Sequence, residues 1–471
     1  MKTRQILTLA LALLLMLPIF AGCGANVGSN DPATAPPDDD IATTPSDDTQ
    51  TAPPPPEDVV ELTFAFWGDP SEFDATKAIL DTYNGLQDKV IVNPLQIGRD
   101  EYNETLQTMA TGDNMPDCGM VAEDTVIGWA RDGLLLPYDI YEGQENKPLD
   151  YITFKFEGNT VAYSAANEVL ALWYNKKMFD EADIPYPPAT LDEAWTWEEF
   201  IDVAKKLTLD ANGNHPGDAG FDKNNITQYG AYVNQYTWQL EVWALSNGGR
   251  WFSEDGTSIV FDDAAIEGMQ KVFDLHLVEN VAPFIDGTVD NGFGLSLGAG
   301  NVAMCTEGQW ATGFRGDELD YGVAVLPYMK TKANICTGGP TGVFATSKYP
   351  AEAAEFLRWY NSEENNIGTI LAGWWMPTKL NWYTDEALLK QWIFDADIRK
   401  PLTAEAYKTA VADVALDFSV TKSTAWYYTP NTYEVLVGAL QPALVEAISG
   451  AKTTKDVVES VRGAMEAALG G

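Results

Sequence analysis

Tryptophans and carboxylates that fall in loops are the side chains of this sequence best suited to hold a small solute. Trp67 ends an apolar stretch beside a Gly-Asp-Pro turn, and Glu123 and Asp124 follow a second apolar stretch. A flat indole ring suits the apolar C–H face of a pyranose, while carboxylates accept hydrogen bonds from its hydroxyls. We therefore expect all three to contact a sugar. Two of them have a structural alternative: Trp67 would cap the end of a sheet, and Asp124 would be the N-cap of the helix through Ala130.

Two adjacent tryptophans form a further candidate contact. Trp374 and Trp375 lie between a glycine and a proline, which predict a loop. Both rings cannot easily be buried in a turn, so we expect at least one of them to contact the solute. Trp243 is a weaker candidate, because it shares a predicted helix with Trp238 and core packing is the better explanation of both rings.

No cofactor and no metal site is expected. The two histidines, His215 and His276, lie far apart, which argues against a zinc site. The loop 210–222 carries oxygen ligands of the kind that calcium takes, but its glycine is not where an EF-hand loop needs one, so a hairpin loop is the default. Cys305 and Cys336 could form a disulfide in an exported protein, with buried free thiols as the alternative.

The elements that would position these residues alternate between strands and helices. Residues 62–66 alternate in hydrophobicity as a strand does, Gly112 ends a helical segment, and Thr196 and Glu199 have the spacing of a capping box. This order predicts an α/β fold with parallel sheets covered by helices, and ligands in such folds bind beyond the carboxyl ends of strands. The expected strands are about 62–66, 90–92, 118–121, 321–326 and 343–346, and the expected helices about 71–84, 102–111, 196–207, 262–277, 350–360, 432–449 and 454–469.

The charge of the chain excludes one class of partner. The formal net charge is −40, whereas nucleic-acid binding needs clustered Lys and Arg. The same charge argues against direct attraction to anionic lipid. Solubility explains it better than an acidic recognition surface does.

The N-terminus predicts export. Residues 1–22 combine a positive start, a short apolar run and small residues, which is the pattern of a signal peptide. The apolar run is short for a helix that must span about 30 Å of hydrocarbon, and an uncleaved anchor helix is the alternative. The segment ending at Cys23 resembles the lipobox of bacterial lipoproteins, which implies acyl chains on Cys23 and a place on the extracytoplasmic face of the cell membrane. Residues 23–58 are acidic and proline-rich and predict a disordered tether.

Several segments of the folded part resemble one family when they are taken together. These are 172–179 (LWYNKKMF), 301–304 (NVAM), 308–310 (GQW), the glycine pair 338–339, and 346–357. In this order they resemble the ABC-transporter extracellular solute-binding proteins, family 1, the sugar-binding group that includes maltose-binding proteins. The resemblance covers nearly all of residues 59–471.

The resemblance implies the two-lobe periplasmic-binding-protein fold (type II-like), with a hinge that the chain crosses more than once and the ligand in a cleft between lobes. Residues 59–168 and about 337–373 would form lobe 1, and about 169–336 and 374–471 lobe 2. The resemblance also implies sugar contacts for Trp310, which matches a ligand-stacking tryptophan, and for Glu168, which stands near the first hinge crossing. Glu307 is a candidate beside Trp310, although a surface turn explains it nearly as well.

The function that follows from the resemblance is binding and not catalysis. A monomeric protein would capture a carbohydrate, most simply an oligosaccharide, by lobe closure and deliver it to the permease subunits of an ABC importer. An exported glycoside hydrolase is one alternative, because hydrolases also pair carboxylates with aromatic rings, although no glycosidase motif is present. A sensory sugar-binding lipoprotein that feeds a membrane receptor is another, since the same fold would serve it.

Overall fold

A computed structural model describes residues 59–68, 70–98, 101–287, 296–313, 319–395 and 400–470. The predicted signal peptide 1–22, Cys23 and the predicted tether 23–58 lie outside these residues. All elements described below belong to one unit, Pro56–Gly471.

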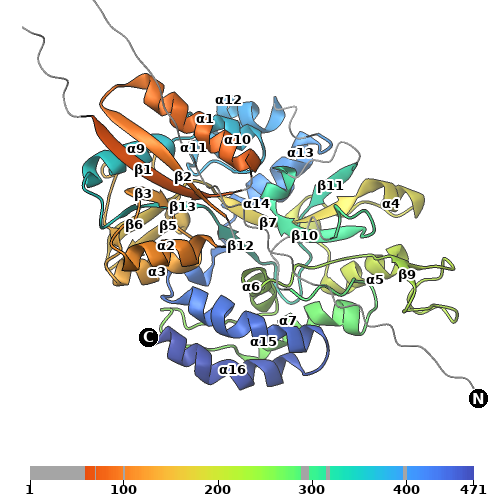
Figure 1. Cartoon of the computed structure of the whole chain (residues 1–471). Coiled ribbons are helices and arrows are strands. Elements are labelled where there is room, and N and C mark those ends of the chain that lie inside the picture. Colours follow the sequence, from red (N-terminus) through yellow and green to blue (C-terminus); the bar gives the residue numbers. More distant parts are fainter. Residues whose placement is uncertain are drawn as a thin grey trace, which may run out of the picture. The chain divides into compact units, whose positions relative to one another are not determined.

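The first sheet contains seven strands within the described residues and is mixed, not purely parallel as predicted (Figure 1). Strand β1 is parallel to β2 and β3, but β13 runs antiparallel to β3, β4 and β6. The antiparallel strand comes from far along the chain, so alternation of local elements could not reveal its direction. The strands are β1 (Val60–Trp67), β2 (Val90–Ile97), β3 (Cys118–Met120), β4 (Leu135–Leu136), β5 (Thr153–Phe156), β6 (Asn159–Ser164) and β13 (Pro340–Phe344).

Helices cover the first sheet and fill its core with aromatic rings. Helix α1 packs on β2 and α9 packs on β3 and β13. The ring of Phe64 meets Phe356 at 5.4 Å, and Phe356 meets Tyr83 at 5.0 Å, so β1, α9 and α1 share one cluster. The helices are α1 (Pro70–Leu86), α2 (Tyr102–Thr111, ending at Gly112 as predicted), α3 (Glu123–Arg131), α9 (Pro350–Tyr360) and α10 (Ile367–Leu371), with the short turn η1 (Asp150–Ile152).

The second sheet is built around β7, whose residues Val169 to Asn175 are all buried. In the described residues it has five strands in the order β10-β7-β12-β14, with β11 also paired to β7. A strand buried on both faces and paired on both sides is expected to be an almost continuous apolar run, as β7 is. The strands are β7 (Glu168–Asn175), β10 (Met304–Gly308), β11 (Tyr321–Ala324), β12 (Asn334–Thr337) and β14 (Thr421–Ser423).

The helices around the second sheet begin and end at residues that the sequence marks, as α5 shows. Thr196 and Glu199 form the predicted capping box of α5, with the Glu199 backbone N–H donating to Thr196 Oγ1 at 3.2 Å. Helices α15 and α16 pack side by side, and both contact α7 (Figure 1). The elements are α4 (Lys176–Glu181), η2 (Leu191–Glu193), α5 (Trp197–Leu207), β8 (Leu209–Asp210), β9 (Ile226–Gln228), α6 (Thr237–Ser246), α7 (Asp263–Leu277), η3 (Gln309–Gly313), η7 (Ala425–Tyr427), η8 (Tyr433–Leu440), α15 (Gln441–Ile448) and α16 (Thr454–Leu469).

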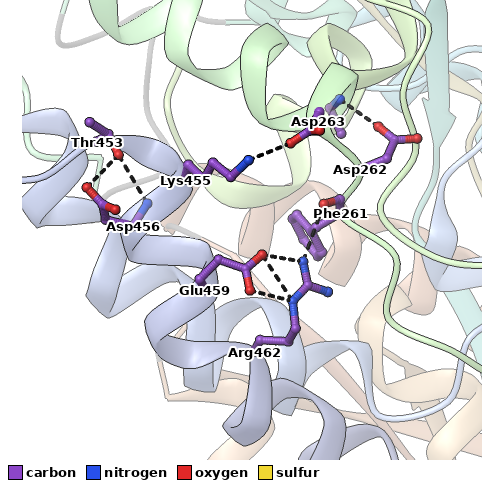
Figure 2. Close-up of polar contacts among 9 residues, drawn as sticks. Phe261, Asp262, Asp263, Thr453, Lys455, Asp456, Glu459 and Arg462 are labelled. Atoms are coloured by element: carbon purple, nitrogen blue, oxygen red, sulfur yellow. Dashed lines mark hydrogen bonds and ion pairs between the residues drawn. The ribbon is translucent and has the colours of Figure 1, made fainter.

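Polar contacts fasten α16 to the start of α7. Figure 2 shows Lys455 reaching Asp263 and Arg462 reaching Glu459 and the backbone of Phe261. The Lys455–Asp263 ion pair is 2.9 Å long and mostly exposed, whereas Arg462 donates to the backbone oxygens of Val260 and Phe261 at 3.1 and 3.4 Å. Arg462 therefore holds the two elements together more firmly than the lysine does.

A set of short helices links α10 to β14. Their largest rings, Trp382, Trp392 and Tyr407, belong to the first hydrophobic cluster, although the predicted lobe boundaries assign these residues to lobe 2. The lobe boundaries therefore stay a prediction. The elements are α11 (Asn381–Thr384), α12 (Glu386–Leu389), the π-helical turn η4 (Lys390–Phe394), α13 (Ala404–Tyr407), the π-helical turn η6 (Lys408–Ala412) and α14 (Asp413–Leu416).

Two short connections join the sheets side by side. Residues 165–167 run from β6 to β7, and Gly338 and Gly339 run from β12 to β13. The N–H of Ala165 donates to the carbonyl oxygen of Gly339 at 2.9 Å. A side chain at Gly338 would place its Cβ 2.3 Å from the Ala166 oxygen, so this close approach requires glycine.

Of the two alternatives for Cys305 and Cys336, the structure shows buried free thiols and no disulfide between them. Cys305 lies on β10 opposite Trp173, and Cys336 lies on β12 opposite Val169, on the other side of β7. The intervening strand separates the two sulfurs beyond bonding range. Both thiols are free and buried, as is that of Cys118. Across the described residues, no helix is both long enough and apolar enough to cross a membrane.

Candidate functional site

The carboxyl ends of β1 and β3 place two predicted residues at one edge of the first sheet. The two strands are parallel with Phe64 opposite Cys118, so Trp67 lies level with the end of β3 and Glu123 begins α3 just beyond it. The half-buried Trp67 ring packs edge-on against Tyr102 at 5.1 Å. This contact fixes one end of the indole on α2, and the partial exposure leaves ring surface for a solute.

Glu123 and Glu168 meet at Thr337, where the two sheets are connected. Thr337 Oγ1 donates to Glu123 Oε1 at 2.9 Å, and Thr337 stands opposite Glu168 in the pairing of β12 with β7. Both carboxylates are half-buried. Two predicted residues that are distant in sequence therefore lie next to one threonine, Glu123 at the start of α3 and Glu168 on β7 of the second sheet.

The hydroxyl of Tyr427 lies beside this pair. Burial raises the pKa of Tyr427 well above its usual range, and the charges of Glu123 and Glu168 raise it further. Tyr427 Oη is 3.4 Å from Ser164 Oγ at the end of β6. No sequence prediction singled out Tyr427, although the run Trp426-Tyr427-Tyr428 before Thr429-Pro430 is a signal of the kind used for Trp374 and Trp375.

Asp124 is not an N-cap, contrary to the structural alternative. The N-cap of α3 is Ala122, and Asp124 lies inside the first turn with its Oδ1 buried and no hydrogen-bond partner for that atom among the described residues. Burial raises the pKa of Asp124 to about 8, with Glu123 and then Glu434 adding to the shift. The carboxyl is therefore mostly protonated at neutral pH. Its neighbours Asn103 and Glu434 place it between α2, α3 and η8.

Glu307 is buried in strand β10, so the surface-turn alternative is wrong. Its side chain is 2 % exposed. Oε1 accepts from Gln239 Nε2 and from the Gly308 N–H, both at 2.9 Å, and Oε2 accepts from Asn234 Nδ2 at 3.4 Å. The two side-chain donors come from α6 and the segment before it, the backbone donor comes from β10 itself, and together they hold the carboxylate rigidly.

Trp310 lies on η3, directly after β10. Its half-buried ring is 5.8 Å from the ring of Trp238, which is itself 5.5 Å from Trp426. The three indoles form a row that we call the tryptophan row: Trp310, Trp238 and Trp426. Only Trp310 keeps substantial exposure, since Trp238 and Trp426 are 5 % and 7 % exposed.

The loop that carries Trp374 and Trp375 is docked on η3. Gln309 Nε2 donates to the carbonyl oxygen of Trp374 at 2.8 Å, and Thr312 Oγ1 donates to that of Gly373 at 2.6 Å. The Trp374 ring lies over Gly313, where an added Cβ would be 2.5 Å from the indole. The structure thus brings Trp374 to the same turn as Trp310.

Trp375 points instead to the first core. Its ring meets Tyr360 at 6.3 Å in an edge-on arrangement and remains half-buried. The next residue, Met376, accepts from the Asn167 N–H at 3.1 Å, which ties this loop to the first connection between the sheets.

Trp243 does not join the other candidates. It is 1 % exposed and packs 4.9 Å from Trp197 in the second core, which agrees with the core packing that we preferred for it.

No metal centre is built from the described residues, in which no group of three or more His, Cys, Asp or Glu side chains converges. The Asp210 carboxylate, the best calcium ligand of its loop, accepts instead from the backbone N–H groups of Asn212, Asn214 and Asp222 at 2.8–2.9 Å. These hydrogen bonds lower the pKa of Asp210, although burial opposes them. The loop is closed by its own backbone, as in the default hairpin interpretation.

Two mixed sheets, joined by short connections with candidate residues around them, define the class of a two-lobe periplasmic binding protein. Residues 67–367 match the model of the bacterial extracellular solute-binding protein family, and the chain belongs to that family.

Solved structures share the fold. The chain is similar to an ABC substrate-binding protein from Listeria monocytogenes in complex with cycloalternan, with 21 % identity and a TM-score of 0.72 over 88 % of this chain and 100 % of the other. It is also similar to the maltose/maltodextrin-binding domain MalE of Bdellovibrio bacteriovorus bound to maltotriose, with 17 % identity and a TM-score of 0.67 over 88 % and 100 %.

A curated relative aligns over part of its length. The maltotriose-binding protein of Pyrococcus abyssi (strain GE5 / Orsay) is 26 % identical over 265 residues, which are 54 % of this chain and 52 % of the relative. The chain therefore spans about half the length of this relative, and the resemblance does not by itself assign a ligand.

Proposed function

We propose that the chain is a solute-binding protein that captures a neutral oligosaccharide and delivers it to an ABC importer. The observation that carries the proposal is the convergence of Glu123 and Glu168 on Thr337, where the two sheets are joined. One carboxylate lies at the start of α3, beyond the edge of the first sheet, and the other lies on β7 of the second sheet, so both can bind one solute at the connection between the sheets. The sugar class is supported by the similar proteins, of which one is a maltotriose-binding protein and two were solved with cycloalternan or maltotriose bound.

The side-chain chemistry favours a neutral ligand. Glu123 and Glu168 can accept hydrogen bonds from sugar hydroxyls, while Trp67, Trp310 and Trp374 offer flat apolar surface to pyranose rings. Anionic sugars such as uronates would meet repulsion from the carboxylates, at a cost that grows as the site excludes water.

The lipid anchor and the location belong to the same proposal. Acylation of Cys23 would hold the protein at the extracytoplasmic face of the cell membrane, and residues 23–58 would let it reach a permease. Mass spectrometry of the mature N-terminus tests this part: an acyl-bearing Cys23 is expected, and an unmodified chain beginning elsewhere would refute it.

Calorimetric titration tests the binding proposal. The purified protein is titrated with maltotriose, a cyclic α-glucan tetrasaccharide, a uronic-acid trisaccharide and a polyol. Saturable binding of a neutral oligosaccharide without hydrolysis products is expected. Binding of the uronate alone, or turnover of any oligosaccharide, would contradict the proposal.

A pair of variants connects binding to the site. Trp310→Ala removes a proposed stacking surface and should weaken binding by more than about 1 kcal/mol, or about fivefold. Tyr349→Ala is the matched control, because this exposed ring stands just before α9, beyond the carboxyl end of the antiparallel strand β13 and so at the opposite edge of the first sheet. Equal affinities for the two variants would remove Trp310 from the site.

A further inference from the structure

The turn η7 places two adjacent rings in two different cores. Trp426 packs in the second hydrophobic cluster with Trp238, whereas Tyr427 packs in the first cluster, where its ring stacks on Phe154 with centroids 4.0 Å apart. Within the described residues, η7 also contacts α3, which begins with Glu123. One short turn is therefore fixed to both halves of the candidate site.

Trp426 supports the proposed ligand contact Trp310 indirectly, through Trp238. Trp426 contacts Trp238, and Trp238 contacts Trp310, so Trp426 stands at the buried end of the tryptophan row. Its indole Nε1 is buried and has no hydrogen-bond partner among the described residues. Ring packing, and not a polar contact, thus determines where Trp426 lies, and offset or tilted aromatic pairs of this kind have a preferred geometry.

Helix α6 holds the same turn through a second side chain. Glu241 lies three residues after Trp238 and so on the same face of α6. Its two carboxyl oxygens accept from the Ala425 N–H at 3.2 and 3.3 Å, and the side chain is 5 % exposed. Trp238 therefore contacts the Trp426 ring of η7, while Glu241 accepts a hydrogen bond from the backbone of η7 at Ala425.

The second ring fixes η7 beside the carboxylates. Tyr427 is stacked on Phe154 and reaches Ser164 with its hydroxyl, close to Glu123 and Glu168. Any displacement of η7 would therefore disturb both the tryptophan row and the surroundings of the two carboxylates.

We propose that η7 positions the sugar site, with Trp426 setting the orientation of the Trp310 ring through Trp238 and Tyr427 keeping this turn in register with Glu123 and Glu168. The inference rests on the proposed function for its ligand readout only. Trp426 is a positioning residue and does not itself touch the solute. Its loss should loosen Trp310 while both cores stay folded.

A spectroscopic double-substitution cycle tests the positioning without any ligand. Neighbouring indoles couple in the circular dichroism spectrum, and Trp310→Phe removes the coupling between Trp310 and Trp238. The difference between the full chain and Trp310→Phe is recorded, and then the same difference is recorded in a Trp426→Phe background. The expected result is a clearly smaller difference in that background, because Trp310 no longer has a fixed angle to Trp238.

The matched control is Trp251→Phe. Trp251 is 2 % exposed in the same core, stacks on Phe261, and lies outside the tryptophan row. The Trp310 difference should keep its full size in this background. A difference of unchanged size in the Trp426→Phe background, or an equal decrease in the Trp251→Phe background, would overturn the proposal.

Affinity for maltotriose, or for whichever neutral oligosaccharide of the panel binds, gives the second readout. Trp426→Phe should weaken binding about fivefold, and Trp310→Phe should then cost less than it does alone, because a ring that has lost its position contributes less. Additive losses would contradict the coupling. If no sugar binds the unaltered chain, the proposed function fails, while the spectroscopic cycle still decides whether Trp426 positions Trp310.

Discussion

Glu363 anchors the far end of the loop that carries Trp374 and Trp375, and its removal should be costly. It is 3 % exposed, and its Oε1 accepts from the Thr378 N–H, Thr378 Oγ1 and the Lys379 N–H at 2.8–3.1 Å. Oε2 pairs with Lys379 Nζ at 2.8 Å, and Lys379 is only 7 % exposed. The buried carboxylate thus accepts four hydrogen bonds, three at Oε1 and one at Oε2.

Glu363→Ala leaves the Lys379 ammonium buried without its counter-charge. Removing one partner of a buried pair costs about 3–5 kcal/mol, because the remaining charge stays desolvated. Glu363→Gln also leaves the Lys379 ammonium without its counter-charge, but it retains an acceptor for the backbone donors and should cost less than Glu363→Ala. Adding Lys379→Met to Glu363→Gln should recover part of that loss, since no buried charge then remains.

Urea unfolding of the unaltered protein, the two single variants and the double variant measures these free energies of unfolding. Asp81→Ala is the control, because its ion pair with Lys77 is about half exposed and should contribute less than about 1 kcal/mol. A loss below about 1 kcal/mol for Glu363→Ala, or no recovery with Lys379→Met, would refute the reasoning. Sugar affinity should fall with Glu363→Ala as well, because the loop that ends at Thr378 would lose its fixed position.

Three further outcomes follow from single contacts. Burial raises the pKa of Glu241 to about 8, so the folded state keeps a proton that the unfolded state releases above about pH 4.5. The free energy of unfolding should therefore fall between about pH 4.5 and pH 8, and Glu241→Gln should make this decrease smaller in urea titrations. The same pH dependence in both proteins would contradict the assignment. Gly313→Ala should destabilise by about 1–3 kcal/mol and weaken sugar binding, because its Cβ strikes the Trp374 ring, while Gly463→Ala in open space on α16 should not destabilise. Arg462→Ala should lower stability by about 1 kcal/mol in thermal melts, because it loses the hydrogen bonds to the backbone oxygens of Val260 and Phe261, just before α7. An unchanged melting temperature would count against that role.

Local signals in the sequence were enough to place many elements. The capping box of α5 and the stop of α2 at Gly112 each act over a few residues, and the structure confirms both. Sheet direction was predicted less well. The partners of β7 come from more than a hundred residues further along the chain, and nothing local in β7 states whether they run parallel or antiparallel.

In the candidate site, too, local sequence predicted some positions, whereas others depend on contacts between distant residues. The carboxyl ends of β1 and β3 placed Trp67 and Glu123 at one edge, because two parallel strands end together. The burial of Glu307 depends on donors from α6, and the role of Trp426 depends on rings that are distant in sequence. Such side chains are recognised only when the tertiary contacts are known.

Titration of the purified protein with neutral oligosaccharides tests the central claim most directly. The account predicts a saturable one-to-one complex with a neutral sugar, a change in tryptophan fluorescence on binding, and loss of most of the affinity when Glu123 and Glu168 are both replaced by glutamine. Silence of the unaltered protein across the whole panel, or unchanged affinity in the doubly substituted protein, would contradict it.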